Sequence, residues 1–558
     1  MRLVASLVTI AVLWGAAAPA FARNPVHARK AMVVAQEPLA ADIGVEVLRG
    51  GGNAVDAAVA VGFALAVTLP AAGNLGGGGF LLARFPDGRA TFLDFRERAP
   101  VAASRDMYLD AEGRLTRDSV VGWRAAGVPG TVQGLEQAHR TYGRKPWAEL
   151  VAPAIRLARE GFPVSYALSR SLRSASELLG QFPESRRIFL KDGAHFEPGD
   201  RLVQPELART LERIARDGAA GFYRGETARR LAAEMARNGG LITEADLRDY
   251  HAVERRPLEG SYRGYRILTA PPPSSGGVGI LQMLGVLEGS DYREAGAGSA
   301  AAIHFVAETM RRFYADRSEH LADPDVHRVP VKALLAPPYL AGLRAGISPG
   351  RATPSDAIAP ARNLRPESPE TTHFSIVDPE GNAVALTYTI NASYGSGVTV
   401  PKLGFLLNNE MDDFAAKPGE PNLFGLVQGE ANAIAPGKRP LSSMTPTIVL
   451  RDEKPYLVLG APGGSRIING VLQVLLNVLD FGMNVQEAID RPRFHHQWRP
   501  DKLYLEKGFS PDTVALLEQR GHTIEPIGGV ALVEAILING GWLQGGTDRR
   551  ANGKAAGF

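Results

Sequence analysis

The chain has no cysteine among its 558 residues. This absence excludes a disulfide framework, a thiolate nucleophile and cysteine ligands for a metal. A strong excess of one charge is also missing, because 62 Lys and Arg stand against 59 Asp and Glu, a net charge of +3. We therefore expect no nucleic-acid partner. Composition gives no reason to expect a cofactor or a metal either, and the length allows two domains or one large layered fold.

Long apolar runs are absent as well, apart from short ones that suit a leader or a core helix. Arg2, the apolar stretch Leu3–Trp14 and the small-x-small sequence Ala20-Phe21-Ala22 are typical of a signal peptide. Val471–Leu479 is apolar but too short to cross a bilayer, which takes about 20 residues. We predict a leader over residues 1–22, no membrane span after its removal, and a periplasmic or secreted protein.

The order of helical and strand patterns indicates the fold class. Leu39–Val67 has a helical pattern broken once by Gly50–Gly52, and most of residues 120–350 is helical in pattern. After Thr371 the pattern changes to strands, followed by a helix over Ile468–Leu479. Two groups of strands with helices before and after them favour an α+β fold with helix-covered sheets over a parallel doubly wound fold.

Thr371 follows a polar, proline-containing segment and begins an apolar-alternating strand, Thr371-Thr372-His373-Phe374-Ser375-Ile376-Val377. The pattern predicts an exposed linker that is cut between Glu370 and Thr371. An N-terminal threonine carries a nucleophilic hydroxyl and its own base, because the α-amino pKa is about 7.7–8.0. An ordinary threonine-rich strand is the alternative.

A second strand follows over a turn at Pro379–Asn382. Pairing Asp378 with Ala383 sets Thr372 opposite Thr389, and a slip of one residue sets Thr371 there instead. Either register brings Thr389 and Asn391, which share one face, beside the candidate nucleophile.

Three further segments carry polar groups that suit a binding site. Leu406–Phe414 brackets three acids with apolar residues, and Lys438–Pro446 holds two adjacent serines. Gly463-Gly464 lies between a strand and a helix, where backbone N–H groups can stabilise an oxyanion. Taken singly, each also suits a solvated turn or a helix cap. The four glycines Gly76–Gly79 predict a close approach of the backbone to another backbone or to a ligand.

These motifs together resemble the γ-glutamyltranspeptidase family. The similar segments cover the mature chain in the family's order: Gly50–Ala58, Asn74–Phe80, Thr371–His373, Leu407–Asn409, Met411–Phe414, Arg439–Met444 and Pro462–Arg466. The resemblance implies an N-terminal-nucleophile hydrolase with an αββα sandwich. It also implies a precursor that cuts itself into a large subunit, residues 23–370, and a small subunit, residues 371–558, which remain a heterodimer.

The resemblance also implies a role for each site residue. Thr371 would cut the precursor and then attack the γ-glutamyl amide of glutathione, passing the group to water or to an amino acid or peptide. The other residues with implied roles are Thr389 (bonded to the nucleophile), Arg96, Ser442 and Ser443 (substrate α-carboxylate), Asn391, Glu410 and Asp413 (α-amino group), and Gly463 and Gly464 (oxyanion hole).

The segment Pro418–Gly425 is similar to the lid loop of bacterial members, in which the aromatic residue is commonly tyrosine. Phe424 lacks the hydroxyl that would reach Asn391, so we expect weaker lid closure. Glu410 occupies a position that holds Gln in some members and Glu in others.

Two other functions are considered. A cephalosporin acylase shares this fold, but a pocket for a glutaryl group has no use for Asp413. A non-catalytic exported binding protein would not need Thr371 or the Gly463-Gly464 turn. The adjacent His495 and His496 are expected to be structural, because neighbours on a strand point to opposite faces.

Overall fold

The computed structural model describes residues 24–191, 193–358 and 371–558. The expected leader and Glu370 lie outside these residues. Two seven-stranded sheets make up the centre of the molecule. Within the described ranges, no helix is both long and apolar enough to span a membrane.

The first sheet carries the proposed nucleophile on a strand in its interior. Its strands, in spatial order, are β19 (Lys554–Gly557), β2 (Met32–Ala35), β10 (Thr372–Val377), β11 (Ala383–Thr389), β3 (Gly78–Arg84), β4 (Ala90–Phe95) and β7 (Val253–Arg255). All neighbouring pairs are antiparallel.

The second sheet packs against the first. Its strands, in spatial order, are β1 (Val26–Ala28), β18 (Trp542–Gly546), β17 (Glu534–Asn539), β13 (Lys454–Gly460), β12 (Thr447–Arg451), β9 (Tyr265–Thr269) and β8 (Leu258–Tyr262). Smaller sheets are formed by β14 (Phe494–His495), β15 (Leu503–Glu506) and β16 (Ile524–Ile527), and by β5 (Phe162–Pro163) and β6 (Arg201–Leu202).

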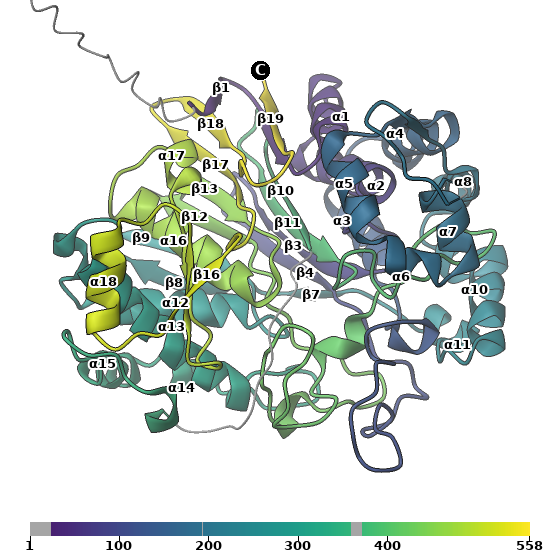
Figure 1. Cartoon of the computed structure of the whole chain (residues 1–558). Helices are drawn as coiled ribbons and strands as arrows, with labels where there is room; N and C mark the ends of the chain where they lie inside the picture. The colour runs from purple at the N-terminus through teal and green to yellow at the C-terminus, as the bar shows by residue number, and fades with distance from the viewer. Residues whose placement is uncertain (1–23, 192, 359–370) are drawn as a thin grey trace, which may run out of the picture.

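Helices cover the outer face of each sheet, as Figure 1 shows. Strand alternation explains the layers: Phe374 and Ile376 of β10 join the core under one group of helices, whereas Val377 joins the core that contains the second sheet. The helices packed on the first core are α1 (Pro38–Arg49), α2 (Ala54–Thr68), α3 (Thr131–Tyr142), α4 (Trp147–Glu160), α5 (Tyr166–Ser174), α6 (Ser176–Gly180), α7 (Pro183–Phe189), α8 (Pro205–Asp217), α9 (Ala220–Tyr223), α10 (Gly225–Arg237) and α11 (Glu244–Arg248).

The second core lies under the remaining helices. They are α12 (Gly276–Glu288), α13 (Ala300–His320), α14 (Val331–Leu334), α15 (Pro337–Ala345), α16 (Ile467–Leu479), α17 (Val485–Asp490) and α18 (Pro511–Gln519). Helix, sheet, sheet and helix therefore follow one another through the molecule. The expected αββα sandwich is confirmed.

The turn between β10 and β11 selects the second of the two registers considered above. Val377 lies opposite Ala383 and Thr372 opposite Tyr388, so Thr371 comes next to Thr389. Asp378 belongs to the loop, where its Oδ1 accepts hydrogen bonds from the backbone N–H groups of Glu380 at 2.9 Å and Asn382 at 3.0 Å. The first pairing considered, Asp378 with Ala383, was wrong because the Asp378 side chain accepts the hydrogen bonds that close the turn.

The glycine run at the start of β3 allows two backbones to cross. A Cβ on Gly76 would lie 2.1 Å from the carbonyl oxygen of Leu406, and one on Gly77 would lie 2.0 Å from that of Thr389. Only glycine tolerates such an approach. The predicted close approach to another backbone is confirmed. The crossing positions the end of β11, where the candidate site lies.

Candidate active site

The residues expected at the site gather in one pocket at the end of β10 and β11. Every one of them lines it except Gly463, which directly precedes Gly464, and Glu370, which lies outside the described residues. The pocket residues in question are Arg96, Thr371, Thr389, Asn391, Glu410, Asp413, Phe424, Ser442, Ser443 and Gly464. Segments far apart in sequence thus contribute to one site.

Thr371 and Thr389 form a hydrogen-bonded pair. The Thr371 Oγ1 donates to the Thr389 Oγ1 over 3.3 Å, and the Thr389 Oγ1 also accepts from the backbone N–H of Asn391 at 2.8 Å. Asn391 adopts a positive φ of 73°, which turns the chain back toward the threonine. Thr371 is only 5% exposed, so its hydroxyl lies in a largely water-free environment.

Arg96 is fully buried beside three carboxylates. Its Nη1 bonds to Glu410 and its Nη2 to Asp413, while Glu97 lies 3.4 Å from Nη1. The Nε donates to the carbonyl of Pro440 at 3.2 Å. The guanidinium is therefore engaged along its whole edge by groups of the protein itself.

Burial and like charge shift the acids of this cluster. Burial raises the pKa of Glu97 to about 7, although Arg96 opposes the shift. Burial, together with Glu97 and Asp413, holds the pKa of Glu410 well above its usual range against the attraction of Arg96. Burial alone would lower the pKa of Arg96, but attraction to Glu410, Asp413 and Glu97 outweighs it and leaves that pKa above its ordinary value.

Arg317, on α13, is a residue that the sequence interpretation missed. Its Nη2 donates to the Ser443 Oγ at 3.3 Å and its Nε to the Ser275 Oγ at 2.9 Å, and Ser275 in turn donates to the Ser442 carbonyl at 2.8 Å. Burial lowers its pKa to about 10. A second buried cation therefore lies directly behind the two serines.

The Gly463-Gly464 turn requires glycine at both positions. The φ values are 142° and 55°, in the region that L side chains rarely adopt. A Cβ on Gly464 would lie 2.7 Å from the Phe424 ring, so the aromatic residue of the lid lies directly on this turn. The turn leads through a short 3₁₀ helix, Gly464–Arg466, into α16.

The segment expected to form a lid covers the pocket in this structure. Phe424 is buried, and the Asn422 Oδ1 accepts from the backbone N–H groups of Phe424 at 3.0 Å and Leu426 at 3.1 Å. The Leu423 N–H donates to the Asp412 Oδ2 at 2.8 Å. With the lid in this position the pocket has a volume of about 20 Å³. That is room for about one water molecule.

Gln497 joins the lid to the glycine turn. Its Nε2 donates to the carbonyls of Phe424 at 3.4 Å and Gly425 at 3.3 Å, and its Oε1 accepts from the Ser465 Oγ at 2.8 Å. His495 lies 2.8 Å from the same Oε1 through its Nε2. The sequence interpretation noted the two histidines but missed the glutamine beside them.

The hydrogen bonds of His495 define its protonation. Its Nδ1 accepts from the Asn469 Nδ2 at 2.7 Å, so the Nε2 carries the proton and donates to Gln497. Burial lowers the His495 pKa to about 3, which keeps the ring neutral. His496 accepts instead from the Trp498 N–H at 3.0 Å through its Nδ1. The expected structural role of both histidines agrees with these contacts.

An αββα sandwich with a threonine at the start of an interior strand defines the class of N-terminal-nucleophile hydrolases. The model of the γ-glutamyltranspeptidase family matches residues 40–558. The glutathione hydrolase proenzyme of Escherichia coli (strain K12) is 50% identical over 531 residues, which cover 95% of this chain and 92% of that protein. The chain belongs to the γ-glutamyltranspeptidase family.

Solved structures agree with this assignment. A cephalosporin acylase from Bacillus halodurans matches with a TM-score of 0.85 at 29% identity, covering 96% of this chain and 97% of the other. A γ-glutamyltranspeptidase chain from Helicobacter pylori matches with a TM-score of 0.57 at 45% identity, covering 58% of this chain and 93% of the other.

Proposed function

We propose that this protein is a self-processing γ-glutamyltranspeptidase that cleaves the γ-glutamyl amide bond of glutathione and related compounds. The observation that carries the proposal is one pocket holding the Thr371–Thr389 pair together with Arg96, Glu410 and Asp413. A nucleophile thus lies within reach of groups that suit the two charges of an amino acid.

Cleavage between Glu370 and Thr371 would free the Thr371 α-amino group. In the proposed reaction this amine takes the proton of the Thr371 hydroxyl while its oxygen attacks the γ-carbonyl carbon. The backbone N–H groups of Gly463 and Gly464 stabilise the oxyanion. The amide C–N bond then breaks, the leaving amine takes the proton, and a γ-glutamyl ester remains on Thr371. Attack by water or by an amino group of a second substrate releases the ester.

Head-group binding requires an exchange of ion pairs. Arg96 is engaged by Glu410 and Asp413, and a volume of about 20 Å³ does not admit a γ-glutamyl group. In our proposal the lid opens, the substrate α-carboxylate takes the place of the two acids on Arg96, and the α-ammonium takes the place of Arg96 on them. Because the substrate brings one negative and one positive group, Arg96 and the two acids each keep a partner of opposite charge.

Asn391, Ser442 and Ser443 complete the proposed head-group site through their amide and hydroxyl groups. We further propose that residues 23–370 and 371–558 remain together as a heterodimer after cleavage. Removal of residues 1–22 would leave this heterodimer in the periplasm or outside the cell. The prediction that Phe424 closes the lid less firmly than a tyrosine stays a prediction.

A cephalosporin acylase is the second candidate, since such an enzyme has the same fold and is 29% identical to this chain. A glutaryl group has no α-ammonium, so it would leave Glu410 and Asp413 without a ligand charge. A binding protein without turnover is the third candidate.

One assay separates the three candidates. The purified protein is given γ-glutamyl-p-nitroanilide or glutaryl-p-nitroanilide, each with and without glycylglycine. We expect release of nitroaniline from the γ-glutamyl compound, faster with glycylglycine, and none from the Thr371→Ala variant. Preference for the glutaryl compound would indicate an acylase, and an uncut chain without turnover would indicate a binding protein.

A further inference from the structure

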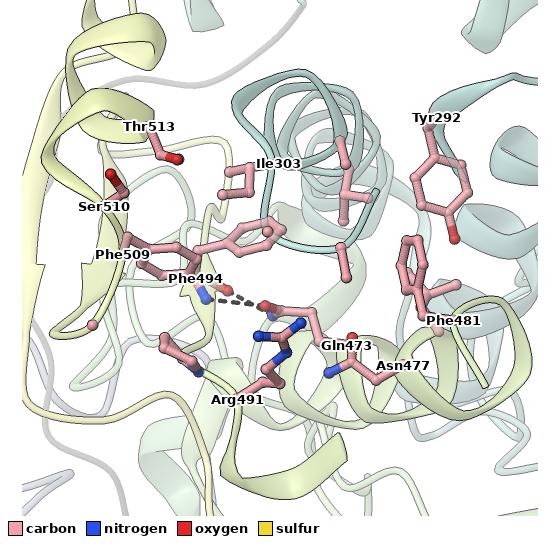
Figure 2. A pocket seen from close by; sticks show the side chains of 17 residues that line it. Tyr292, Ile303, Gln473, Asn477, Phe481, Arg491, Phe494, Phe509, Ser510 and Thr513 are labelled. Carbon is pink, nitrogen blue, oxygen red and sulfur yellow. Dashed lines mark hydrogen bonds between the residues drawn. The ribbon is translucent and has the colours of Figure 1, made fainter. Parts of the chain in front are cut away.

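A second pocket lies outside the candidate active site, between α13, α16 and the segment at residues 508–513 (Figure 2). Its volume is about 200 Å³. It shares no lining residue with the pocket that holds Thr371. A function for this pocket is therefore a separate question from the γ-glutamyl chemistry.

The walls are largely apolar. Ile303 of α13 and Leu476 of α16 face it together with aromatic rings. The rings of Phe494 and Phe509 pack edge to face with centroids 6.3 Å apart. Tyr292 packs in the same way on a fourth ring, that of Phe481, at 6.2 Å. Such walls favour a flat, apolar ligand body.

The two amide side chains of the lining are already engaged by the protein. The Gln473 amide donates to the carbonyls of Asn469 at 2.8 Å and Phe494 at 2.7 Å, and accepts from the Phe494 N–H at 3.0 Å. The Asn477 Nδ2 donates to the Ala488 carbonyl at 3.0 Å. These groups hold the wall together and leave a ligand few neutral partners.

Arg491 is different from the rest of the lining. Figure 2 shows its guanidinium directed into the ring of side chains, while the residue remains exposed to solvent. Among the described residues its side chain has no hydrogen-bond or ion-pair partner. The preceding acid, Asp490, lies 3.9 Å from Arg549, and Glu487, one helical turn before Arg491, forms no ion pair with it. The pocket therefore has one cation that the protein does not neutralise.

We propose that this pocket binds a small monocarboxylate with a compact aromatic body. The planar guanidinium of Arg491 suits a carboxylate in a bidentate geometry. A dry cavity of about 150 Å³ holds benzene, so this larger one admits a benzene ring with a short acid side chain. A free amino acid fits less well, because its ammonium would meet Arg491 without an acid beside it.

The probe for this proposal is phenylacetate, with phenylacetamide as its neutral counterpart of the same shape. Isothermal titration of the whole protein measures binding of each to the wild type, Arg491→Gln and Ala297→Phe. Ala297 is a half-buried lining residue, so a larger side chain there fills the pocket without entering the main core. Arg229→Gln, on the exposed face of α10, is the matched control for loss of one arginine.

We expect phenylacetate to bind the wild type and Arg229→Gln equally, and at least about tenfold more tightly than it binds Arg491→Gln. Ala297→Phe should abolish binding, and phenylacetamide should bind the wild type as weakly as phenylacetate binds Arg491→Gln. An unchanged melting temperature and normal γ-glutamyl hydrolysis show that the variants are folded. Absence of phenylacetate binding to the wild type, or equal binding to Arg491→Gln, would overturn the proposal.

Discussion

In the proposed reaction Arg96 holds two arrangements of charge, one with the protein's own acids and one with substrate. Its two Nη atoms contact different acids, Glu410 and Asp413, at the same time. The planar fork holds the two acids at a fixed spacing, which the single nitrogen of a lysine ammonium cannot do. The same geometry can present two parallel N–H groups to a carboxylate. The shape of the side chain, as much as its charge, is therefore important here.

We predict that Arg96→Lys and Asp413→Asn each reduce catalytic efficiency by about 30- to 5,000-fold. This range corresponds to the roughly 2–5 kcal/mol lost when one partner of a buried, hydrogen-bonded charge pair is removed. The measurement is kcat/KM for a γ-glutamyl anilide. Cutting of the precursor should continue, because no substrate head group is bound during that step. Wild-type efficiency in either variant would contradict the assignment.

The raised pKa values of Glu97 and Glu410 predict a pH-dependent affinity for the head group. In our proposal Glu410 binds the ammonium and Glu97 lies beside it on the same arginine, so negative charge on either acid favours the ammonium, and burial raises the pKa of Glu97 to about 7. Affinity should therefore rise as pH increases from about 6 to 8, by up to about tenfold for one group titrating near 7.

Inhibition by L-glutamate tests this pH dependence, because it measures binding and includes no reaction step at the Thr371 amine. Its inhibition constant should fall from pH 6 to pH 8 in the wild type, and fall less in Glu97→Gln, which keeps the size of the side chain but removes the group whose pKa lies near 7. An inhibition constant that rises over this range would contradict the prediction.

Single residues differ in how well the sequence predicts them. Thr371, Asp413 and the two serines lie in short motifs and were found. Arg317 could not be found in this way, because its link to Ser443 depends on the packing of α13 against a segment more than a hundred residues later. Gln497 was next to a noted histidine pair, but its role depends on the lid's backbone carbonyls, which carry no sequence signal.

At the scale of elements, the hairpin was predicted in outline. The strands β10 and β11 were expected, but their register depends on which atoms close the loop at Asp378. The interior strand β2 was not expected, because four buried residues next to a leader have no alternating pattern to detect. By contrast, helices with one apolar face, such as α8, lie within residues 120–350, where a helical pattern was expected.

The lid and the glycine turn form one unit through Gln497. Its amide contacts the carbonyls of Phe424 and Gly425 on one side and the Ser465 hydroxyl on the other. We predict that Gln497→Ala raises KM for the γ-glutamyl donor by about five- to 150-fold, the effect of losing roughly two neutral hydrogen bonds of about 0.5–1.5 kcal/mol each. Turnover should change less, since opening of the lid is easier.

A matched variant distinguishes lid closure from general damage. His495 contacts the Gln497 amide but not the lid itself, so His495→Gln should raise KM in the same direction but by less. Separate thermal melts of both variants show whether the fold is intact. A fall in kcat with an unchanged KM would contradict a role in holding the lid.

At the scale of the whole molecule, the two proposed subunits are interleaved in both sheets. In the first sheet β10 and β11, from residues 371–558, lie between β2 and β3, from residues 23–370. In the second sheet β12 pairs with β9 across the same division. Separation of the subunits would break both sheets and expose both cores. A cut between Glu370 and Thr371 need not separate them.

We therefore predict that self-cleavage divides the chain into two fragments that remain bound to each other. Purified protein should give fragments of about 350 and 190 residues on a denaturing gel, but a single species in size-exclusion chromatography. The smaller fragment should begin at Thr371 by N-terminal sequencing. Thr371→Ala should remain a single chain, whereas Thr371→Ser, which keeps a hydroxyl, should still cut itself.

A different N-terminus, or cleavage of the alanine variant at the same rate, would refute Thr371 as the group that acts. Fragments that separate without denaturant would instead refute the shared sheets as the link between the subunits.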